Sequence, residues 1–456
     1  MTTILILLFV LGYLAITLEH PLKLDKTVPA LLMASIMWAF LAIGFNLGWF
    51  SVIDSSGIVF NIFNPNSENQ TEGFYAVLTH HFAATSEILI FLIGAMTIVE
   101  LVDLHQGFDI IKSFIKTRSK VKLLWIIGII GFLLSSIIDN LTATIVIISV
   151  LRKLIPNKED RIWYASLIII ATNAGGAWSP IGDVTTTMLW ISKKVSAKGL
   201  IEYMIFPSIT CFVVPFFIAS KLNVFKGNIE ILEIDNTIEN KLLSSKKMLI
   251  IGLSAIIFVP IFKTITHLPP YMGMIFSLGI VWLCSEFIHP EESFDKSNKN
   301  YSVQNALSRI EISSILFFLG ILMSVACLES LVFGSFNNQE AGTLRFAAEN
   351  LSNAIPDTNI VVLLLGFLSA IIDNVPLVAA TIGMFTQEID NPIWHFIAYC
   401  SGTGGSMLII GSAAGVAAMG MEKINFIWYF KKISWLALIG FLAGAICFLG
   451  IEHFSS

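Results

Sequence analysis

Three aspartates stand alone in long apolar stretches of the sequence. Each is the only charged residue of its stretch: Asp139 in 123–151, Asp183 in 162–191 and Asp373 in 358–386. An ionised aspartate at the middle of a membrane costs roughly 2.5–3.5 kcal/mol on insertion scales, and such a residue marks an ion pathway or binding site by default. Carboxylate oxygens are also ligands that hard cations prefer. The three acids therefore predict a cation or proton site within a membrane.

Oxygen-bearing side chains gather around these acids, in two glycine-rich islands and beside the acidic tips. Glycines and a proline in the island 171–183 break a helix inside the bilayer, and a water-filled cation site can satisfy the freed carbonyls. A second island, 401–406, repeats the break. The further candidate ligands are Asn140, Asn173, Thr185, Thr186, Ser369, Asn374, Ser401, Thr403 and Ser406. These oxygens suit Na⁺ or Li⁺, which we expect at Asp139, Asp183 and Asp373, and they call for no resident cofactor.

The same residues also have structural interpretations. An aspartate at a re-entrant tip can cap a helix end, and this role is compatible with ion binding at Asp139 and Asp373. Glycines permit close packing of helices. His80 and His81 lie near the mouth of a predicted span, with Glu87 further inside it. These three are candidates for pH sensing or a proton pathway, and an ordinary interfacial role is the alternative for the histidines.

The composition places these residues in an integral membrane protein. Of 456 residues, 55% are hydrophobic and only 13% are charged, and the mean hydropathy is +0.81. A soluble chain carries about 25% charged residues. The net charge of −5 argues against nucleic-acid binding. The five cysteines lie in apolar runs without a CxxC pair, which favours small core residues over disulfides or metal ligands.

Long apolar runs predict an all-α polytopic fold. We expect spans at about 3–20, 28–50, 84–104, 162–191, 200–220, 247–265, 271–289, 312–332, 393–421 and 425–451. Two further runs, 123–151 and 358–386, are interrupted at their middle by an Asp-Asn pair. If both of these runs re-enter, 22 of the 27 Lys and Arg fall on one side of the membrane. Basic residues concentrate on the cytoplasmic side, so we expect two re-entrant hairpins that open to opposite sides, with both termini outside.

The two halves of the sequence resemble each other. Residues 134–140 (LSSIIDN) match 368–374 (LSAIIDN) at six of seven positions, and 172–176 correspond to 401–405 at a similar spacing. An odd number of crossings in each half gives the halves opposite orientations, as in secondary transporters. We therefore predict two inverted repeats, each with five transmembrane helices, one re-entrant hairpin and one helix broken at the midplane. Their bounds are 1–225 and 247–456, with a cytoplasmic linker at 226–246.

These motifs resemble those of the NhaD-type sodium/proton antiporters of the ion transporter superfamily. The resemblance covers nearly the whole chain and rests on the paired IIDN tips and on TNAGGAWSPIGDVTT at 172–186. It implies functional roles for Asp139, Asn173, Asp183, Thr185, Thr186, Ser369, Asp373 and Asn374, with His80, His81 and Glu87 as lesser candidates. It also implies a homodimer whose transport domain moves against a scaffold. Many NhaD members carry a second acid just before the first tip acid, but Ile138 stands there in this chain, so the charge stoichiometry does not carry over.

The sequence thus predicts a secondary transporter of a bacterial inner membrane that exchanges Na⁺ or Li⁺ for H⁺ by competition at buried carboxylates. The alternative is sodium-coupled uptake of a small anion such as a dicarboxylate. An anion site calls for Arg, Lys or bare helix N-termini. No Arg or Lys occurs in the two runs with Asp-Asn pairs, 123–151 and 358–386, or in the two runs with glycine-rich islands, 162–191 and 393–421. Anion carriers of the superfamily also typically have Ser-Asn-Thr tips. The sequence contains no nucleotide loop, nucleophile elbow or metal-ligand cluster, so neither an enzyme nor an ATP-driven pump is expected.

Overall fold

The computed structural model describes residues 2–17, 24–54, 57–63, 70–110, 115, 117–229, 244–288, 303–336, 339–371 and 374–455. Asp373 and most of the predicted linker lie outside the described residues. The chain forms two compact units, and each is described by itself. The first comprises 1–89, 311–361 and 375–388, and the second comprises 90–310, 362–374 and 389–456. These units group segments by packing, so the division into repeats stays a prediction.

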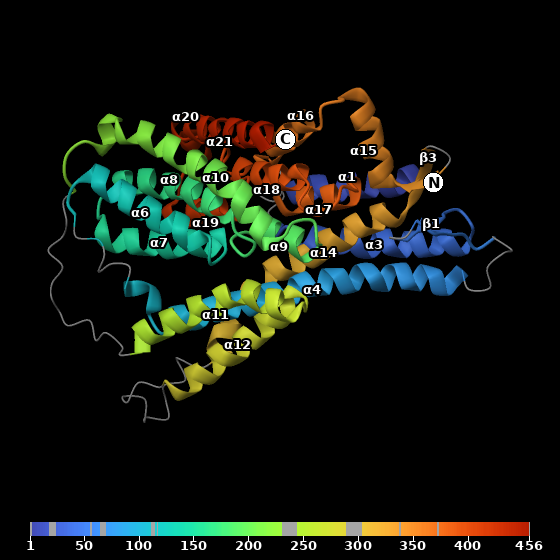
Figure 1. Ribbon diagram of the computed structural model, residues 1–456, viewed down its shortest axis with the longest axis horizontal. Coiled ribbons are helices and arrows are strands. Elements are labelled where there is room, and N and C mark those ends of the chain that lie inside the picture. The colour runs from blue at the N-terminus through green and yellow to red at the C-terminus, as the bar shows by residue number, and fades with distance from the viewer. Residues whose placement is uncertain are drawn as a thin grey trace. The chain divides into compact units, whose positions relative to one another are not determined.

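Seven helices of the described residues are long and apolar enough to cross a membrane (Figure 1). They are α3 (Thr27–Asn46), α4 (Gln70–Leu104), α10 (Ala197–Ser220), α11 (Ser244–Thr266), α12 (Pro270–Phe287), α14 (Ile312–Ser330) and α21 (Ser434–Ser455). Each overlaps a predicted span, although α4 begins earlier and α21 later than expected, so the polytopic helical fold expected from the sequence is confirmed. The other elements outside the interrupted segments are α1 (Thr2–Thr17), β1 (Val52–Ile53), β2 (Val59–Phe60), η1 (Gly107–Asp109), η2 (Asn223–Phe225), α13 (Val303–Arg309), β3 (Val332–Phe336), β4 (Gln339–Gly342), α15 (Thr343–Ala354) and α20 (Phe426–Lys432).

Each of the four interrupted segments is a pair of helices. The pairs are α6 (Lys120–Ser135) with α7 (Asn140–Leu154), α8 (Lys158–Gly176) with α9 (Val184–Ile191), α16 (Thr358–Ser369) with α17 (Asn374–Met384), and α18 (Pro392–Gly404) with α19 (Ala413–Glu422). The second helices of three pairs have side-chain caps. Asp139, Asp183 and Ser412 each accept a backbone N–H of the helix that follows them. These caps satisfy amides that the breaks would otherwise leave unpaired inside an apolar region.

In the first unit, α3 packs against α14. The indole Nε1 of Trp38 donates to the backbone oxygen of Met323 (2.8 Å), and the hydroxyl of Thr27 donates to the backbone oxygen of Ser313 (3.0 Å). Two antiparallel strand pairs, β1–β2 and β3–β4, lie in the same unit and are joined by a bridge between Val52 and Leu331. The two hydrogen bonds hold α3 and α14 side by side, and the bridge between Val52 and Leu331 joins the segments that follow these helices.

In the second unit, α8 is the central helix. Every residue of α8 from Tyr164 to Gly176 is buried, as expected for a helix that is surrounded by protein. The hairpin helices α6 and α7 pack on it, as do α10 and α19. α10 also lies beside α21, and α11 beside α12 (Figure 1). The broken helices therefore lie at the core of this unit.

Two glycines allow the hairpins to approach the broken helices closely. A Cβ at Gly175 of α8 would overlap the backbone oxygen of Phe132 in α6. A Cβ at Gly404 of α18 would in the same way overlap the backbone oxygen of Gly366 in α16. Because backbone atoms cannot give way as a flexible side chain can, any larger residue would force the hairpin off its broken helix. Here the glycines serve the close packing that was the alternative to a cation site.

α4 differs from its predicted bounds, because it begins at Gln70 and not near residue 84. At 1.5 Å per residue its 35 residues extend about 52 Å, well beyond the roughly 30 Å hydrocarbon core. The additional turns are polar enough to be hidden from a search for apolar runs. His80 and His81 thus lie within a continuous helix, about three turns after its start.

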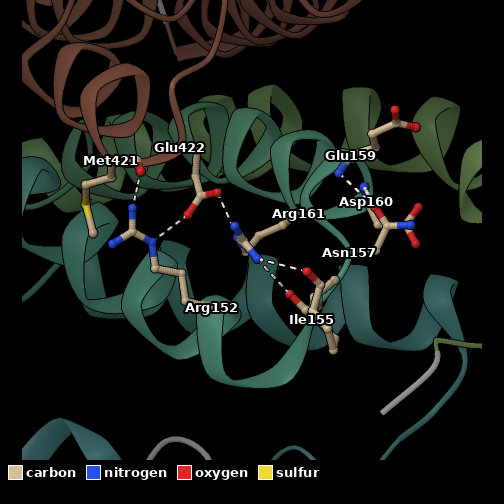
Figure 2. A network of polar contacts seen from close by, with 9 residues as sticks. Arg152, Ile155, Asn157, Glu159, Asp160, Arg161, Met421 and Glu422 are labelled. Carbon is tan, nitrogen blue, oxygen red and sulfur yellow. Dashed lines mark hydrogen bonds and ion pairs between the residues drawn. The ribbon is translucent and has the colours of Figure 1, made fainter. Parts of the chain in front are cut away.

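A buried ion cluster joins α7 and α8 to the end of α19 (Figure 2). Glu422 is only 1% exposed, and its two carboxylate oxygens accept from Nε of Arg152 and Nε of Arg161, each at 2.7 Å. Arg152 also donates to the backbone oxygen of Met421, and Arg161 to that of Ile155. One acid of the second half of the chain thus holds two arginines of the first half.

Candidate cation site

Asp183 stands at the centre of the polar cluster in the second unit. Its side chain is 2% exposed and lies at the break between α8 and α9. Oδ1 accepts the backbone N–H of Thr185 (3.1 Å), which caps α9. Oδ2 accepts from the side-chain amides of Asn140 (3.0 Å) and Asn374 (3.3 Å). The two asparagines are the first residues of α7 and α17, so the matching tips of the sequence meet at one carboxylate.

Asn173 extends this cluster towards the second broken helix. Its Oδ1 accepts from Asn140 (3.0 Å), and its Nδ2 donates to the hydroxyl oxygens of Ser406 (2.9 Å) and Ser412 (3.0 Å). Each residue of this network is at most 5% exposed: Asn140, Asn173, Asp183, Asn374, Ser406 and Ser412. A continuous hydrogen-bonded network therefore links both broken helices and both tips, from Asn374 through Asp183 to the two serines.

Several predicted ligands are engaged with the backbone. The hydroxyl of Ser369 donates to the backbone oxygen of Ser401 (2.7 Å), and Ser401 donates to that of Ile397 (2.7 Å). Thr403 donates to the backbone oxygen of Tyr399 (2.6 Å), and Thr186 to that of Asp183 (2.9 Å). These hydroxyls hold the broken helices and their hairpins in place by donating their protons, and each hydroxyl oxygen has two lone pairs with which to bind an ion.

Thr185 differs from these residues. Its side chain is fully buried, and its hydroxyl has no hydrogen-bond partner in the part of the chain that the structure describes. A buried hydroxyl without a partner costs about 1–3 kcal/mol. A bound ion that accepts coordination from this oxygen would remove that cost, so Thr185 is a candidate ligand beside Asp183.

Of the two aspartates predicted at the hairpin tips, the structure describes Asp139 but not Asp373. Asp139 caps α7, and it accepts the backbone N–H (2.9 Å) and the hydroxyl (2.6 Å) of Thr142. Its capping role, one of the two interpretations from the sequence, is therefore present. Ion binding by Asp139 stays a prediction. Asp373 lies outside the described residues, so its role stays a prediction as well.

His80, His81 and Glu87 belong to α4 in the first unit. The rings of the two histidines lie 5.6 Å apart. Both histidines line a cavity of about 240 Å³, together with Asp54, Phe60, Ala76 and Val77. The two histidines thus line a cavity within the first unit. The role of His80, His81 and Glu87 in pH sensing or proton movement stays a prediction.

Two positions of the site were missed by sequence reasoning. Ser412 was not among the candidate ligands, although it follows Asp183 by 229 residues, the spacing between the two islands. Gly402 was noted only as part of an island, although it follows Asn173 by the same spacing. The repeat spacing, applied residue by residue, would have found both.

Chemically, the cluster is one carboxylate that accepts three N–H groups, within a network of amide and hydroxyl side chains that also carry oxygens. No Lys or Arg occurs in the apolar runs 123–151, 162–191, 358–386 and 393–421, which contribute its residues. Carboxylate, amide and hydroxyl oxygens are the ligands of hard cations, and a carboxylate can equally hold a proton. The arrangement can therefore bind a small cation or a proton, one in place of the other.

Comparison with known proteins gives the chain its relatives. A family model described as citrate transporter matches residues 6–394. The chain is similar to sodium/proton antiporter 1 of Arabidopsis thaliana (43% identical over 98% of this chain and 72% of that protein) and to sodium/proton antiporter 2 of the same plant (40%, 98% and 99%). It is also similar to the Na⁺/H⁺ antiporter NhaD of Vibrio cholerae, with 28% identity over 98% of this chain and 91% of that protein.

Among solved structures, the YdaH transporter of Alcanivorax borkumensis has a similar fold. The TM-score is 0.59 over 94% of this chain and 99% of that one, at 13% identity. At this identity the similarity concerns the fold alone. It agrees with the polytopic helical fold that the seven apolar helices of the described residues indicate.

Proposed function

Because the chain belongs to the citrate transporter family, with sodium/proton antiporters among its relatives, we propose that it exchanges Na⁺, or Li⁺, for H⁺ at Asp183. The observation that carries this proposal is the burial of a single carboxylate within a network of amide and hydroxyl groups. The two ions compete for the same oxygens, and no second pathway is required.

The coupling follows from the cost of an unneutralised charge. A bare carboxylate in a low-dielectric site is disfavoured, and either a proton or a cation relieves the same penalty. A loaded site can therefore pass through the conformational change with either ion, while the empty charged site is held back. Exchange is obligatory for this reason alone.

Uptake of an anion together with sodium is the second candidate. The family description favours it, because it names citrate. The absence of Lys and Arg from the apolar runs 123–151, 162–191, 358–386 and 393–421 argues against it, because no basic side chain there would balance the charge of an anion beside Asp183. Citrate that fails to alter sodium-driven proton movement, and labelled citrate that does not accumulate in vesicles, would exclude this candidate.

Competition predicts how the apparent cation affinity depends on pH. Protons occupy Asp183 more as the pH falls, so the Na⁺ concentration that gives half-maximal exchange rises by up to tenfold per pH unit if one proton is displaced per cation. Proton movement in everted vesicles, measured at several Na⁺ concentrations and pH values, tests this. A half-maximal concentration that is constant with pH, with only the maximal rate changing, would rule out a shared site.

We further propose that residues 1–225 and 247–456 are inverted repeats joined by the cytoplasmic linker 226–246. The matching tips and the corresponding caps at Asp183 and Ser412 support this proposal. Each hairpin then enters the membrane from its own side, and the two meet where Asn140 and Asn374 contact Asp183.

Cysteine labelling tests these orientations. In a background without the five native cysteines, Lys122→Cys and Lys158→Cys flank the first hairpin at exposed positions, and Pro356→Cys and Glu388→Cys flank the second. We expect the first two to react with an impermeant reagent from one face of the membrane and the last two from the other face. Reaction of the first two from opposite faces would mean that 120–154 crosses the bilayer.

A homodimer with a mobile transport domain remains part of the proposal, and the resemblance to NhaD-type antiporters supports it. The bacterial inner membrane also stays a prediction, because the relatives named above come from both a plant and a bacterium. Integral membrane localisation itself follows from the seven apolar helices and the family.

A further inference from the structure

Gly402 leaves room for a methyl group beside the carboxylate of Asp183. A Cβ built at Gly402 would lie 3.6 Å from Oδ2 of Asp183 and 3.8 Å from Oγ1 of Thr185. Its other near neighbour is Cβ of Ala177, at 3.6 Å. A position one bond away from Gly402 Cα therefore faces both the carboxylate oxygen and the buried hydroxyl that has no partner among the described residues.

Packing does not require glycine at this position. The three distances are those of ordinary van der Waals contacts, so a methyl group would fit without displacing its neighbours. Gly404, two residues further along α18, is the opposite case, because a Cβ there would overlap the backbone oxygen of Gly366. Gly402 lies within α18 and is not among the glycines with a positive φ, so its backbone does not require glycine either.

The corresponding position in the first half of the chain is filled. Asn173 precedes Gly402 by the 229 residues that separate the two islands, and its side chain donates to Ser406 and Ser412 and accepts from Asn140. A side chain at 402 would meet Asp183 from the opposite broken helix. The two halves thus differ near the carboxylate of Asp183. The first half has the amide side chain of Asn173, and the second half has room for a methyl group at Gly402.

We propose that Gly402 sets the size of the cation position, because the side chain it lacks leaves room for Na⁺ between Asp183 and Thr185. This inference rests on the proposed cation/proton exchange. The oxygen–metal distances of hard cations are about 2.0–2.6 Å, so an ion that contacts Asp183 Oδ2 lies within reach of a methyl group at 402. Added bulk there disfavours the larger ion first and spares the smaller Li⁺.

Gly402→Ala tests the inference, with Gly131→Ala as the matched control. Gly131 is also a buried glycine of a helix, and its Cβ would make ordinary contacts at 3.5 Å or more with Ile168, Thr172 and Ile147, away from Asp183. Purified protein in liposomes is assayed for proton movement with NaCl or LiCl as the only added salt. Melting temperatures are measured with and without each salt.

We expect Gly402→Ala to raise the half-maximal Na⁺ concentration about tenfold or more while the value for Li⁺ changes less than about threefold. Stabilisation against heat by NaCl should be lost and stabilisation by LiCl retained. Gly131→Ala should behave as the wild type in both assays. The thermal shift reports ion binding even if the variant transports too slowly to measure.

Two results would overturn the inference. In one, Gly402→Ala keeps the wild-type half-maximal concentrations for both Na⁺ and Li⁺, which would show that residue 402 does not limit the size of the bound ion. In the other, both constants rise equally and the ion-free melting temperature falls, so that the glycine serves packing. If the wild type itself shows no Na⁺-dependent or Li⁺-dependent proton movement, the proposed exchange fails, which is distinct from a failure of Gly402 alone.

Discussion

Replacing Asp183 by asparagine is expected to lower cation-dependent proton exchange at least about a hundredfold while leaving the folded protein in the membrane. Asparagine has the same shape, and its single oxygen can still accept the backbone N–H of Thr185 that caps α9. It has no charge to balance a cation and cannot carry a proton at neutral pH. A hundredfold loss corresponds to about 2.8 kcal/mol, at 1.4 kcal/mol for each factor of ten.

Asp160→Asn is the matched control. Asp160 lies in the first turn of α8 and forms an ion pair with Lys120 at 2.7 Å, so its replacement changes the same chemical group in the same pair of helices, away from the break. This variant should exchange at the wild-type rate, because partly exposed pairs contribute only about 0–1 kcal/mol. Normal exchange by Asp183→Asn would show that the acid serves only to cap α9. Asp183→Glu adds a further check, since it should shift the pH profile of exchange rather than scale it.

Glu422→Gln is expected to lower stability strongly. The variant leaves Arg152 and Arg161 together without their shared counter-charge, in a cluster whose acid is 1% exposed. Removing one partner of a buried pair costs about 3–5 kcal/mol, a large part of the 5–15 kcal/mol that stabilises a typical protein. The value for this cluster should lie at the lower end, because Arg152 is 45% exposed and can be solvated.

The melting temperature of the detergent-purified protein measures this effect. Glu202→Gln is its control, because Glu202 pairs with Lys198 on the surface of α10 at 3.6 Å, where both side chains are more than half exposed. We expect the free energy of unfolding of the control to differ from that of the wild type by no more than about 0.5 kcal/mol, so its melting temperature should be nearly unchanged. Equal melting of the two variants would mean that the cluster contributes no more than a surface pair.

The sequence predicted the parts of the fold that local signals determine. The breaks between α6 and α7 and between α8 and α9 follow from single acids and glycines in apolar runs, and each was found at its place. The start of α4 was wrong, because its first turns are too polar for an apolar search to include them.

Contacts between distant segments could not be predicted in this way. Glu422 is separated from Arg152 by 270 residues and from Arg161 by 261, and each residue alone is an ordinary charge at a helix end. The same holds for the site. Asn140, Asp183 and Asn374 were all candidates, but only the folded chain brings the two amides to one oxygen of the carboxylate.

Asp183 is itself an anion that is held by the beginnings of three helices. Its donors are a backbone N–H of α9 and the first side chains of α7 and α17, and helix N-termini bind anions in many unrelated proteins. A carboxylate in such a pocket can belong to the protein or to a dissolved acid such as citrate. In the first case the protein supplies the negative charge permanently, and the ions that come and go must be positive. In the proposed exchange, one residue at the end of a broken helix therefore decides the sign of the ion that this pocket binds.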